Sequence, residues 1–314
     1  MAQLEPFAPH NTEEYILAQK QLGATPFVLG LYQGETMVAG CAAFLTSGWL
    51  GKRVEIPSLP SLPDAEQFFA GLSEFCRCHR VWQLVLGSFG SSKVVLPTIG
   101  RLLEKKNRFE FIIELDNLDS LKLSSNHKRN INRARKAGVA FKRTSEPNAI
   151  APHLELMGSS MARREERGEN VSGVIKESVM RAMLETAVGE FFQAYAGAQI
   201  LSSIFILKSS KVGYYHSAGT STKGMELGAS LFLVYSAAEL LSEDGFRELN
   251  LGGAEPENPG LYRFKKGFGA VERRLEAAIF SLVPPILYRA HWALRLMRRD
   301  PKGFLQRLTQ SSTM

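Results

Sequence analysis

Runs of hydrophobic and polar positions divide the first 115 residues into a hairpin, two helices and two further strands. Apolar runs bounded by turn residues predict strands at residues 26–32, 36–46, 82–86 and 109–115. Asp64 is a good N-cap for a helix that ends near His79, and a second helix is expected over residues 96–105. Three prolines after the hairpin predict a loop: Pro57, Pro60 and Pro63.

The second half of the chain has a similar order of elements. An antiparallel meander is expected first, and a helix that ends before Gly245 follows it. Further along, a strand, a short helix and a last strand complete the series. The strands of this half are expected at residues 190–197, 202–208, 212–219, 248–251 and 273–282, and the helices at 226–241 and 260–266. Helices at 148–165 and 172–188 lie between the halves.

This repeated order predicts an α/β (α+β) protein with two related halves. Each half is expected to be a mixed, mostly antiparallel sheet flanked by helices. The expected boundaries are residues 1–115 for the first half, 116–283 for the second, and 284–314 for a C-terminal tail. Helical spacing of apolar residues in that tail predicts a basic amphipathic helix, which either docks on the body of the protein or lies on acidic lipid.

Composition is that of a globular protein. Of 314 residues, 45% are hydrophobic and 22% charged, which excludes a disordered or fibrous chain. No apolar run approaches the roughly 20 residues that cross a bilayer. The N-terminus has neither a basic start nor an apolar run, so we expect no signal peptide and a cytoplasmic location. Cys41, Cys76 and Cys78 are expected to be reduced structural residues, and no metal site is predicted.

Positive charge is concentrated in two segments. The formal net charge is +7, yet residues 124–143 alone carry seven Lys and Arg and no acid. The tail from residue 284 onward has six basic residues against one acid, Asp300. The rest of the chain is therefore slightly acidic. Such local concentrations favour anionic partners, namely phosphates, nucleic acid or acidic lipid.

The first of these segments predicts a helix with two different faces. Ser and Asn residues at its start are good N-caps, and Gly138 is a good stop. Arg129, Arg133 and Lys136 share one face, whereas His127, Ile131 and Ala134 lie on the opposite face and should pack inward. The cationic face is either a solvated helix surface or a phosphate-binding surface. The lack of any compensating acid gives the second interpretation weight.

Two further groups of residues suit chemistry. Gly252 and Gly253 follow a buried strand and allow close backbone approach to a ligand, although such a pair also makes ordinary turns. Phe264-Lys265 lies between two Gly-bounded turns, where a cation at a pocket wall could stabilise an oxyanion or a phosphate. Tyr214 and His216 share one face of a strand, so His216 is either a general base or a structural histidine.

Two segments resemble the FemAB-like branch of the GNAT acyltransferase superfamily. His127-Lys128-Arg129-Asn130-Ile131-Asn132-Arg133-Ala134 with Gly138 is similar to that branch's basic segment. Leu251-Gly252-Gly253, followed by Gly260 to Gly269, is similar to its ending. The resemblance covers about residues 115–282; the first 115 residues match only in element order. Asn250 stands where the branch often has Asp, and Leu227-Gly228-Ala229 is only a remnant of the usual coenzyme-A pyrophosphate loop.

The resemblance implies two GNAT-like halves and a transfer of an acyl or aminoacyl group. The donor would be an acyl-CoA, an acyl carrier protein or an aminoacyl-tRNA, acting as co-substrate with no permanently bound cofactor. The acceptor would be an amine or hydroxyl of a cell-envelope precursor, such as those of peptidoglycan or exopolysaccharide. In the family, the Phe-Lys pair of the ending lines the transfer site, which maps onto Phe264 and Lys265.

The leading hypothesis is therefore an acyltransferase. Lys265 would stabilise the developing oxyanion, Phe264 would form a pocket wall and His216 would be the base. Substrate binding is assigned to Arg129, Arg133, Lys136, Gly252, Gly253 and Tyr214. We expect no DNA partner, and the cytoplasmic location allows peripheral contact with the acidic inner face of the membrane. The alternative hypothesis is a non-catalytic module that binds nucleic acid or acidic lipid, although few aromatics interleave with the basic residues for stacking on bases.

Overall fold

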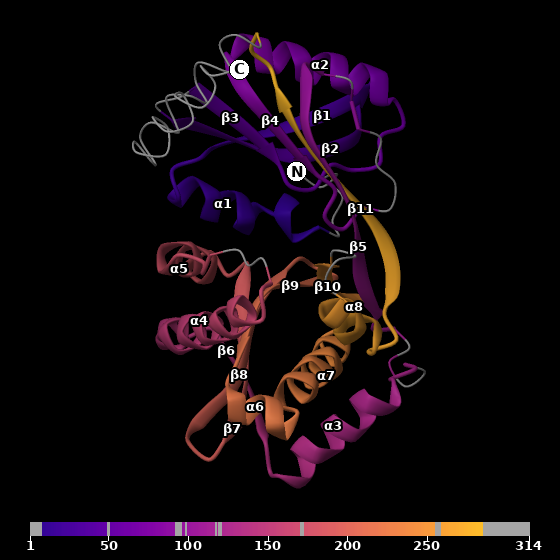
Figure 1. Cartoon of the computed structure of the whole chain (residues 1–314). Coiled ribbons are helices and arrows are strands. Elements are labelled where there is room, and N and C mark those ends of the chain that lie inside the picture. Colours follow the sequence, from indigo (N-terminus) through magenta and orange to yellow (C-terminus); the bar gives the residue numbers. More distant parts are fainter. Residues whose placement is uncertain are drawn as a thin grey trace, which may run out of the picture.

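The structure is a computed structural model that describes residues 8–48, 51–91, 96–97, 99–116, 118, 121–169, 173–254 and 259–284. Within these residues, eleven strands form one continuous mixed sheet that runs the length of the molecule (Figure 1). The strand order is β1-β2-β3-β4-β11-β5-β10-β9-β8-β7-β6. The predicted tail lies outside the described residues from residue 285 onward. None of the described helices has the length and apolar composition needed to span a bilayer.

The first half contains most of the elements that the pattern predicts. Its elements are α1 (Glu13–Gln21), β1 (Thr25–Gln33), β2 (Thr36–Gly48), β3 (Gly51–Ile56), α2 (Ala65–Cys78), β4 (Val81–Gly87) and β5 (Arg101–Glu114). Asp64 caps α2 as predicted, by accepting from the backbone N–H of Gln67 at 2.9 Å. The helix predicted over residues 96–105 is wrong, because residues 101–105 belong to β5 and pair with β11.

The second half follows the predicted order closely. Its helices are α3 (Ser125–Lys136), α4 (Ile150–Glu166), α5 (Glu177–Glu185), α6 (Thr222–Leu227), α7 (Ala229–Glu243) and α8 (Pro259–Lys266). Its strands are β6 (Ala140–Thr144), β7 (Gly189–Ala196), β8 (Gln199–Lys208), β9 (Val212–Thr220), β10 (Glu248–Ala254) and β11 (Val271–Ser281). The predicted long helix is broken at Gly228, which has a left-handed φ of 74° and separates α6 from α7.

The two halves share one topology and exchange one strand each. In the first half, β3 and β4 are parallel and joined through α2; in the second, β9 and β10 are parallel and joined through α7. Next to β4 lies β11, from the end of the described chain, and next to β10 lies β5, from the first half. We call this arrangement the strand exchange. It confirms the predicted fold class, two related halves with mixed sheets flanked by helices.

Three hydrophobic cores hold the layers together. One lies between α2 and the first-half strands, and includes Cys41 and Cys76. A second lies between the second-half sheet and α3 with α7 (Figure 1). The third lies on the opposite face of the sheet and joins the halves, since it combines Tyr15 of α1 and Phe44 of β2 with residues of α5, β7, β8 and β9. The junction of the halves is therefore packed, and residues from both can meet there.

Candidate functional site

The parallel strands β9 and β10 separate at the centre of the molecule. They pair at Val212–Glu248, Gly213–Leu249 and Tyr214–Asn250, and no pairing between them continues beyond this point. Both strands are irregular here. In the pairing of β9 with β8, the register shifts at His216, which has no partner residue. In the pairing of β10 with β5, the register shifts between Asn250 and Gly253. Backbone groups of the diverging strands are thereby released from the ladder, which is where a ligand can bind them.

Lys265 lies beside this divergence. Its side chain comes from α8, is only 5% exposed, and donates from Nζ to the carbonyl oxygen of Gly253 at 2.6 Å. Gly252 has a φ of 71°, and a Cβ added there would lie 3.7 Å from Lys265 Nζ and 3.5 Å from Tyr214 Oη. The structure thus brings together four of the predicted site residues, Lys265, Tyr214, Gly252 and Gly253. Their roles in substrate binding and catalysis stay predictions.

Glu110 is a member of this cluster that sequence reasoning missed. It lies in β5, is fully buried, and accepts from the backbone N–H of Gly90 at 3.0 Å. Burial raises the pKa of its carboxyl, against the opposing effects of the Gly90 N–H, Asn250, Arg273 and Lys265. Its Oε1 and the Nδ2 of Asn250 are buried without a normal hydrogen bond, although the amide lies close enough to affect the pKa. The sequence signal that could have identified Glu110 is the presence of a glutamate within the otherwise apolar run from Phe109 to Ile113.

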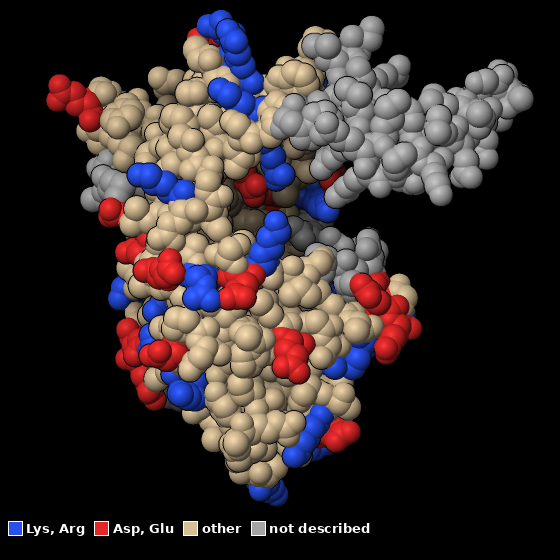
Figure 2. Space-filling model, turned by 90° about the vertical axis from the view of Figure 1, so that its left-hand side faces the viewer, with Lys and Arg blue, Asp and Glu red and all other residues tan. Residues whose placement is uncertain are grey.

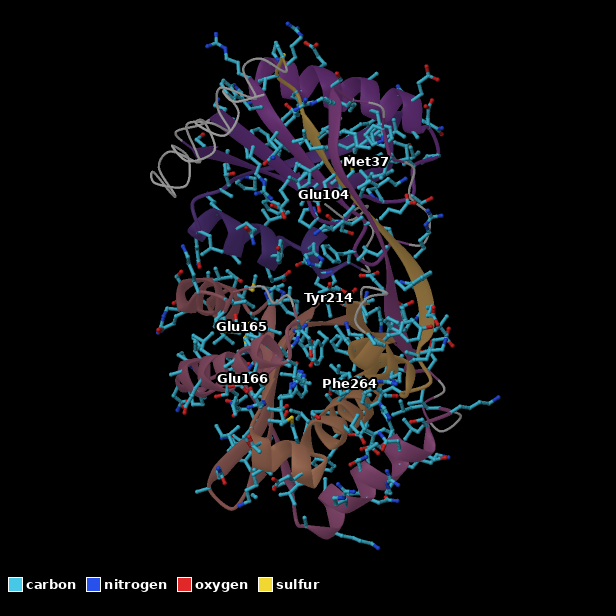
Figure 3. The ribbon with its side chains drawn as sticks, viewed as in Figure 1. Met37, Glu104, Glu165, Glu166, Tyr214 and Phe264 are labelled. Carbon is cyan, nitrogen blue, oxygen red and sulfur yellow. The ribbon has the colours of Figure 1, made fainter. Side chains whose placement is uncertain are left out.

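Tyr214 and His216 face the third core, on the same side of β9 as the alternation predicts. The His216 ring lies 6.2 Å from that of Phe205 in this core, and burial lowers the pKa of His216 to about 4. Tyr214 lies at the junction of the halves (Figure 3), where its ring contacts those of Phe89 and His10 at 5.6 and 5.1 Å. His216 is therefore neutral at pH 7, but its conjugate acid is too strong for it to be an efficient base.

The basic helix has the two faces that the sequence predicts. His127, Ile131 and Ala134 are buried, whereas Arg129, Arg133 and Lys136 are exposed. Arg129 donates to Asn126 Oδ1 of the same helix, and Arg133 to the carbonyl oxygen of Glu226 in α6 at 2.9 Å. None of the contacts that the structure gives these two arginines reaches Lys265. The structure therefore does not bring the cationic face and the Phe264-Lys265 pair to one point, and substrate binding by this face stays a prediction.

Several positive charges of the basic segment are engaged within the protein. Arg135 pairs with Glu239 at 3.4 Å, and Arg143 pairs with the buried Glu190 at 2.8 Å and with Asp244. On the face shown in Figure 2, basic and acidic side chains are interspersed over the surface. Within the basic segment, the charges of Arg135 and Arg143 are offset by Glu239, Glu190 and Asp244.

The break between α6 and α7 is covered by α3. A Cβ on Gly228 would lie 2.6 Å from the carbonyl oxygen of Asn130, so the α3 backbone packs directly on this turn. This turn is Leu227-Gly228-Ala229, which the sequence resemblance interprets as a remnant of the usual coenzyme-A pyrophosphate loop. Its left-handed glycine is needed both for the turn and for the approach of α3.

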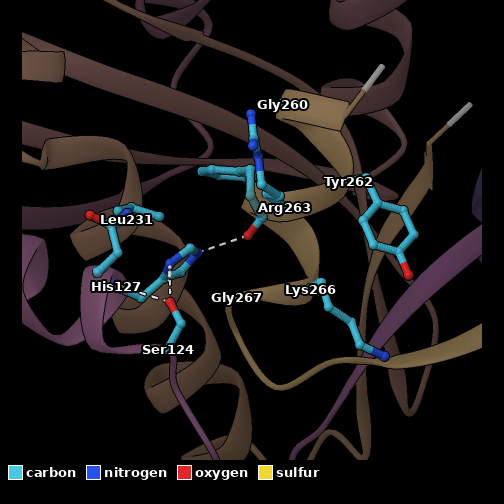
Figure 4. Close-up of a pocket in the computed structure, with 10 residues that line it drawn as sticks. Ser124, His127, Leu231, Gly260, Tyr262, Arg263, Lys266 and Gly267 are labelled. Atoms are coloured by element: carbon cyan, nitrogen blue, oxygen red, sulfur yellow. Dashed lines mark hydrogen bonds between the residues drawn. The ribbon is translucent and has the colours of Figure 1, made fainter. Parts of the chain in front are cut away.

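A pocket of about 680 Å³ lies between the start of α3, the first turn of α7 and α8 (Figure 4). Its lining residues are Ser124, Asn126, His127, Leu231, Gly260, Tyr262, Arg263, Phe264, Lys266 and Gly267. Phe264 lines this pocket and Lys265 does not, so the role of Phe264 as a wall of the transfer site stays a prediction. Among the described residues, no group of three or more His, Cys, Asp or Glu could hold a metal ion.

Comparison with known proteins identifies the fold. Residues 122–266 match the family model described as acetyltransferase (GNAT) domain. FemX is 11% identical, with a TM-score of 0.62 over 85% of this chain and 91% of that one. A tandem GNAT protein from the clavulanic acid biosynthesis pathway is 13% identical, with a TM-score of 0.52 over 83% and 84%. No curated protein sequence matches the chain.

A third solved structure is the C-terminal domain of a protein from Agrobacterium fabrum named as a lysylphosphatidylglycerol synthetase. It is 15% identical, with a TM-score of 0.51 over 81% of this chain and 85% of that one. The fold is therefore that of the tandem GNAT proteins, and residues 122–266 are similar to a GNAT domain. The resemblance to the FemAB-like branch is confirmed, since FemX shares the fold of nearly the whole described chain.

Proposed function

We propose that this protein is an acyltransferase that moves an acyl or aminoacyl group from an activated carrier to an amine or hydroxyl. The observation that carries the proposal is the burial of Lys265 where β9 and β10 separate, beside Tyr214 and the Gly252-Gly253 turn. A buried cation next to released backbone groups is suited to a carbonyl that becomes an oxyanion during acyl transfer. The GNAT match of the same segment supports this assignment.

The reaction proceeds by direct attack on the donor carbonyl. Lys265 stabilises the negative charge that develops on the carbonyl oxygen. Phe264, the next residue of α8, lines the neighbouring pocket between α3, α7 and α8. Glu110 suits the role of base better than His216 does, because burial moves the pKa of its carboxyl upward towards neutrality. Burial lowers the pKa of His216 to about 4, so its neutral form is a weak proton acceptor.

The acceptor in this proposal is a cell-envelope precursor of the peptidoglycan or exopolysaccharide type. The FemAB-like resemblance is what supports this class. Two of the structural neighbours, FemX and the protein named as a lysylphosphatidylglycerol synthetase, support aminoacyl transfer in general. The same neighbours favour an aminoacyl donor over a simple acetyl donor. The covered Gly228 turn agrees with this preference, because α3 packs where the remnant of the coenzyme-A loop lies.

A donor screen tests the proposal. The purified chain is incubated with acyl-CoA, acyl carrier protein and aminoacyl-tRNA pools, each with and without amine-bearing precursor mixtures, and release of the free carrier is measured. We expect acceptor-dependent release from one pool, strongest for aminoacyl-tRNA. If a folded protein releases no carrier from any pool but binds RNA or acidic vesicles with steep salt dependence, the alternative of a non-catalytic binding module replaces the proposal.

A further inference from the structure

The pocket between α3, α7 and α8 contains a serine and a histidine in direct contact. Ser124 Oγ lies 2.9 Å from His127 Nδ1, and His127 Nε2 lies 2.8 Å from the carbonyl oxygen of Phe264 (Figure 4). A carbonyl oxygen can only accept, so Nε2 carries the hydrogen and Nδ1 of the neutral ring has the lone pair. The Ser124 hydroxyl therefore donates to Nδ1, which is the relation of a nucleophile to its base.

We propose that Ser124 and His127 form a second reactive site, which accepts an acyl group from an activated ester or thioester. This activity goes beyond the transfer at Lys265 and does not depend on it. The Phe264 carbonyl fixes the tautomer and orientation of the ring, as the third member of a nucleophile–base–orienter series does. Burial lowers the pKa of His127, so the ring is neutral and able to take a proton at pH 7.

Helix capping alone does not account for this arrangement. Ser124 caps α3 by accepting from the backbone N–H of His127 at 3.2 Å, which requires no imidazole. Ser221 is the internal comparison, because it caps α6 in the same way through the N–H of Gly224 at 3.0 Å. The Ser221 hydroxyl donates to a backbone carbonyl, that of Leu201, at 3.1 Å. Of these two serines, only Ser124 donates its hydroxyl hydrogen to an imidazole nitrogen.

The surroundings keep the histidine in place. His127 is 3% exposed, and its ring lies edge-on to Phe268 with ring centroids 4.6 Å apart. Gly267 makes room for it, because a Cβ at that position would lie 2.1 Å from His127 Cε1. The base is therefore held rigidly against a pocket that is open to a ligand. Preorganisation of this kind is what a nucleophilic site requires.

The step balances without any further reagent. As Ser124 Oγ forms a bond to the donor carbonyl carbon, its proton moves to His127 Nδ1. The carbonyl electrons pass to the oxygen, and the backbone N–H groups of Ser125 and Asn126, which begin α3 and have no acceptor within the helix, are the available donors for that oxyanion. The C–S or C–O bond of the donor breaks, and the leaving group takes the proton from Nδ1. Water or an amine then releases the acyl group by the reverse proton path.

The pocket lining indicates the class of acyl donor. Leu231, Tyr262 and Phe264 provide an apolar wall suited to a hydrophobic acyl chain. Lys266 pairs with Glu272 at 2.7 Å, whereas Arg263 is exposed and makes no ion pair within the described part of the chain. An apolar pocket with one free guanidinium at its wall suits a hydrophobic acyl ester or thioester whose carrier is anionic.

Active-site labelling tests this site without any carrier or acceptor. The full chain is treated with an alkyl fluorophosphonate, and the modified peptide is located by mass spectrometry. In parallel, p-nitrophenyl butyrate is used to follow a burst of nitrophenol. We expect label on Ser124, a burst near one equivalent, and a labelling rate that rises with pH through a pKa below the usual histidine value. Label on no serine, or on a different serine, would overturn the proposal.

Matched variants separate reactivity from capping. Ser124→Asn keeps an N-cap and removes the nucleophile, and it should abolish both the label and the burst. His127→Gln should slow labelling by about 10²-fold or more. Ser221→Asn, at the other serine cap, should label like the wild type. Equal labelling of wild type and Ser124→Asn would reject the site. Since wild-type peptide mapping decides the question on its own, poor folding of a variant does not leave it open, and neither result bears on transfer at Lys265.

Discussion

The ammonium of Lys265 donates to the carbonyl oxygen of Gly253 at 2.6 Å, so a side chain of α8 is anchored to the backbone of β10. The anchor lies at the point where β10 leaves β9, and Gly252 provides the space beside it. The cation is thereby fixed at the junction of the two halves, close enough to Glu110 for each charge to influence the other. The first two predictions concern these two charges.

Removal of the Lys265 ammonium should lower turnover more than it lowers stability. In Lys265→Ala we expect kcat to fall by about 10²-fold or more, because one preorganised stabiliser of the oxyanion is lost. The folded state should persist, with a cost of about 1–3 kcal/mol for the unpaired Gly253 carbonyl and the lost positive charge near Glu110. Kinetics with the donor found in the screen, together with urea unfolding, measure both. Lys223→Ala on α6 is the control, and unchanged kcat in folded Lys265→Ala would exclude this role.

Glu110 should determine the acidic limb of the pH profile. Its carboxyl has a raised pKa and must be ionised to accept a proton, so kcat/KM should increase with pH through an ionisation above the usual glutamate value of about 4.3. Glu110→Gln should remove this limb and lower kcat/KM by about 10²-fold or more. A pH–rate profile of both proteins makes the comparison. Identical profiles would show that Glu110 does not take part in proton transfer.

Gly267 should tolerate no side chain. In Gly267→Ala the new methyl would lie 2.1 Å from His127 Cε1, and that buried residue also packs edge-on against Phe268. We expect a loss of about 1–3 kcal/mol in the free energy of unfolding. Gly158→Ala in α4 is the matched control, because nothing lies within 4 Å of its added Cβ. That variant should be more stable by about 0.5–1 kcal/mol, as measured by urea titration.

Strong local patterns predicted most of the fold, and long-range pairing accounts for the errors. Asp64, Gly245 and the apolar runs of β7 to β10 mark their elements whatever their partners are. Residues 101–105 contain Leu, Glu and Lys, which favour a helix, but pairing with β11 makes them a strand. The strand exchange could not be predicted, because nothing local in β5 or β11 indicates which half either strand will join.

The residues of the candidate site also fall into two groups, those that the local sequence marks and those that only the fold brings together. Lys265, Tyr214, Gly252 and Gly253 were predicted because their own turns and strand mark them, and the structure brings them together. Glu110 was missed because it reaches the candidate site only through the pairing of β5, a strand of the first half, with β10 of the second half. The pairing of Ser124 with His127 was also missed, because a serine at a helix start is explained by capping alone. Proximity across the fold, which no pattern along the chain encodes, supplied these residues.

Buried histidines should make the protein acid-sensitive. His153 bonds to Ser203 and Ser217 at 2.8 and 2.9 Å, and burial lowers its pKa from 6.5 to about 3. The unfolded chain binds this proton near pH 6.5 and the folded chain does not, so stability is complete above pH 6.5 and decreases as the pH falls towards 3. His10 and His216, with pKa values lowered to about 3 and 4, act in the same direction.

Urea unfolding at pH 7, 6 and 5 measures this dependence. Each such histidine should contribute up to about 1.4 kcal/mol per pH unit below 6.5. His153→Gln lowers stability at pH 7 but should give a shallower decline towards pH 5, because one titrating group is gone. A variant whose stability declines as steeply as that of the wild type would show that His153 does not remain neutral in the folded protein.

The exposed face of α3 should affect carrier binding through charge alone. In Lys128→Glu/Lys136→Glu, KM for an anionic carrier should rise several-fold at low salt with kcat unchanged. The difference should shrink as salt is added, because exposed charges are screened. Lys20→Glu on α1 reverses a charge elsewhere on the surface and serves as the control. Equal KM values for all three proteins at low salt would mean that this face does not contact the carrier.

The strand exchange makes the two halves mutually dependent. A first half produced alone would leave the edge of β4 open where β11 belongs, and a second half produced alone would lack β5 beside β10. Each fragment would expose a long edge strand that invites aggregation. A chain nicked between β5 and α3 should instead remain an interlocked two-piece complex, because neither piece can leave without tearing a strand from the other's sheet. The candidate site therefore needs both halves, because Glu110 comes from the first and Lys265 from the second.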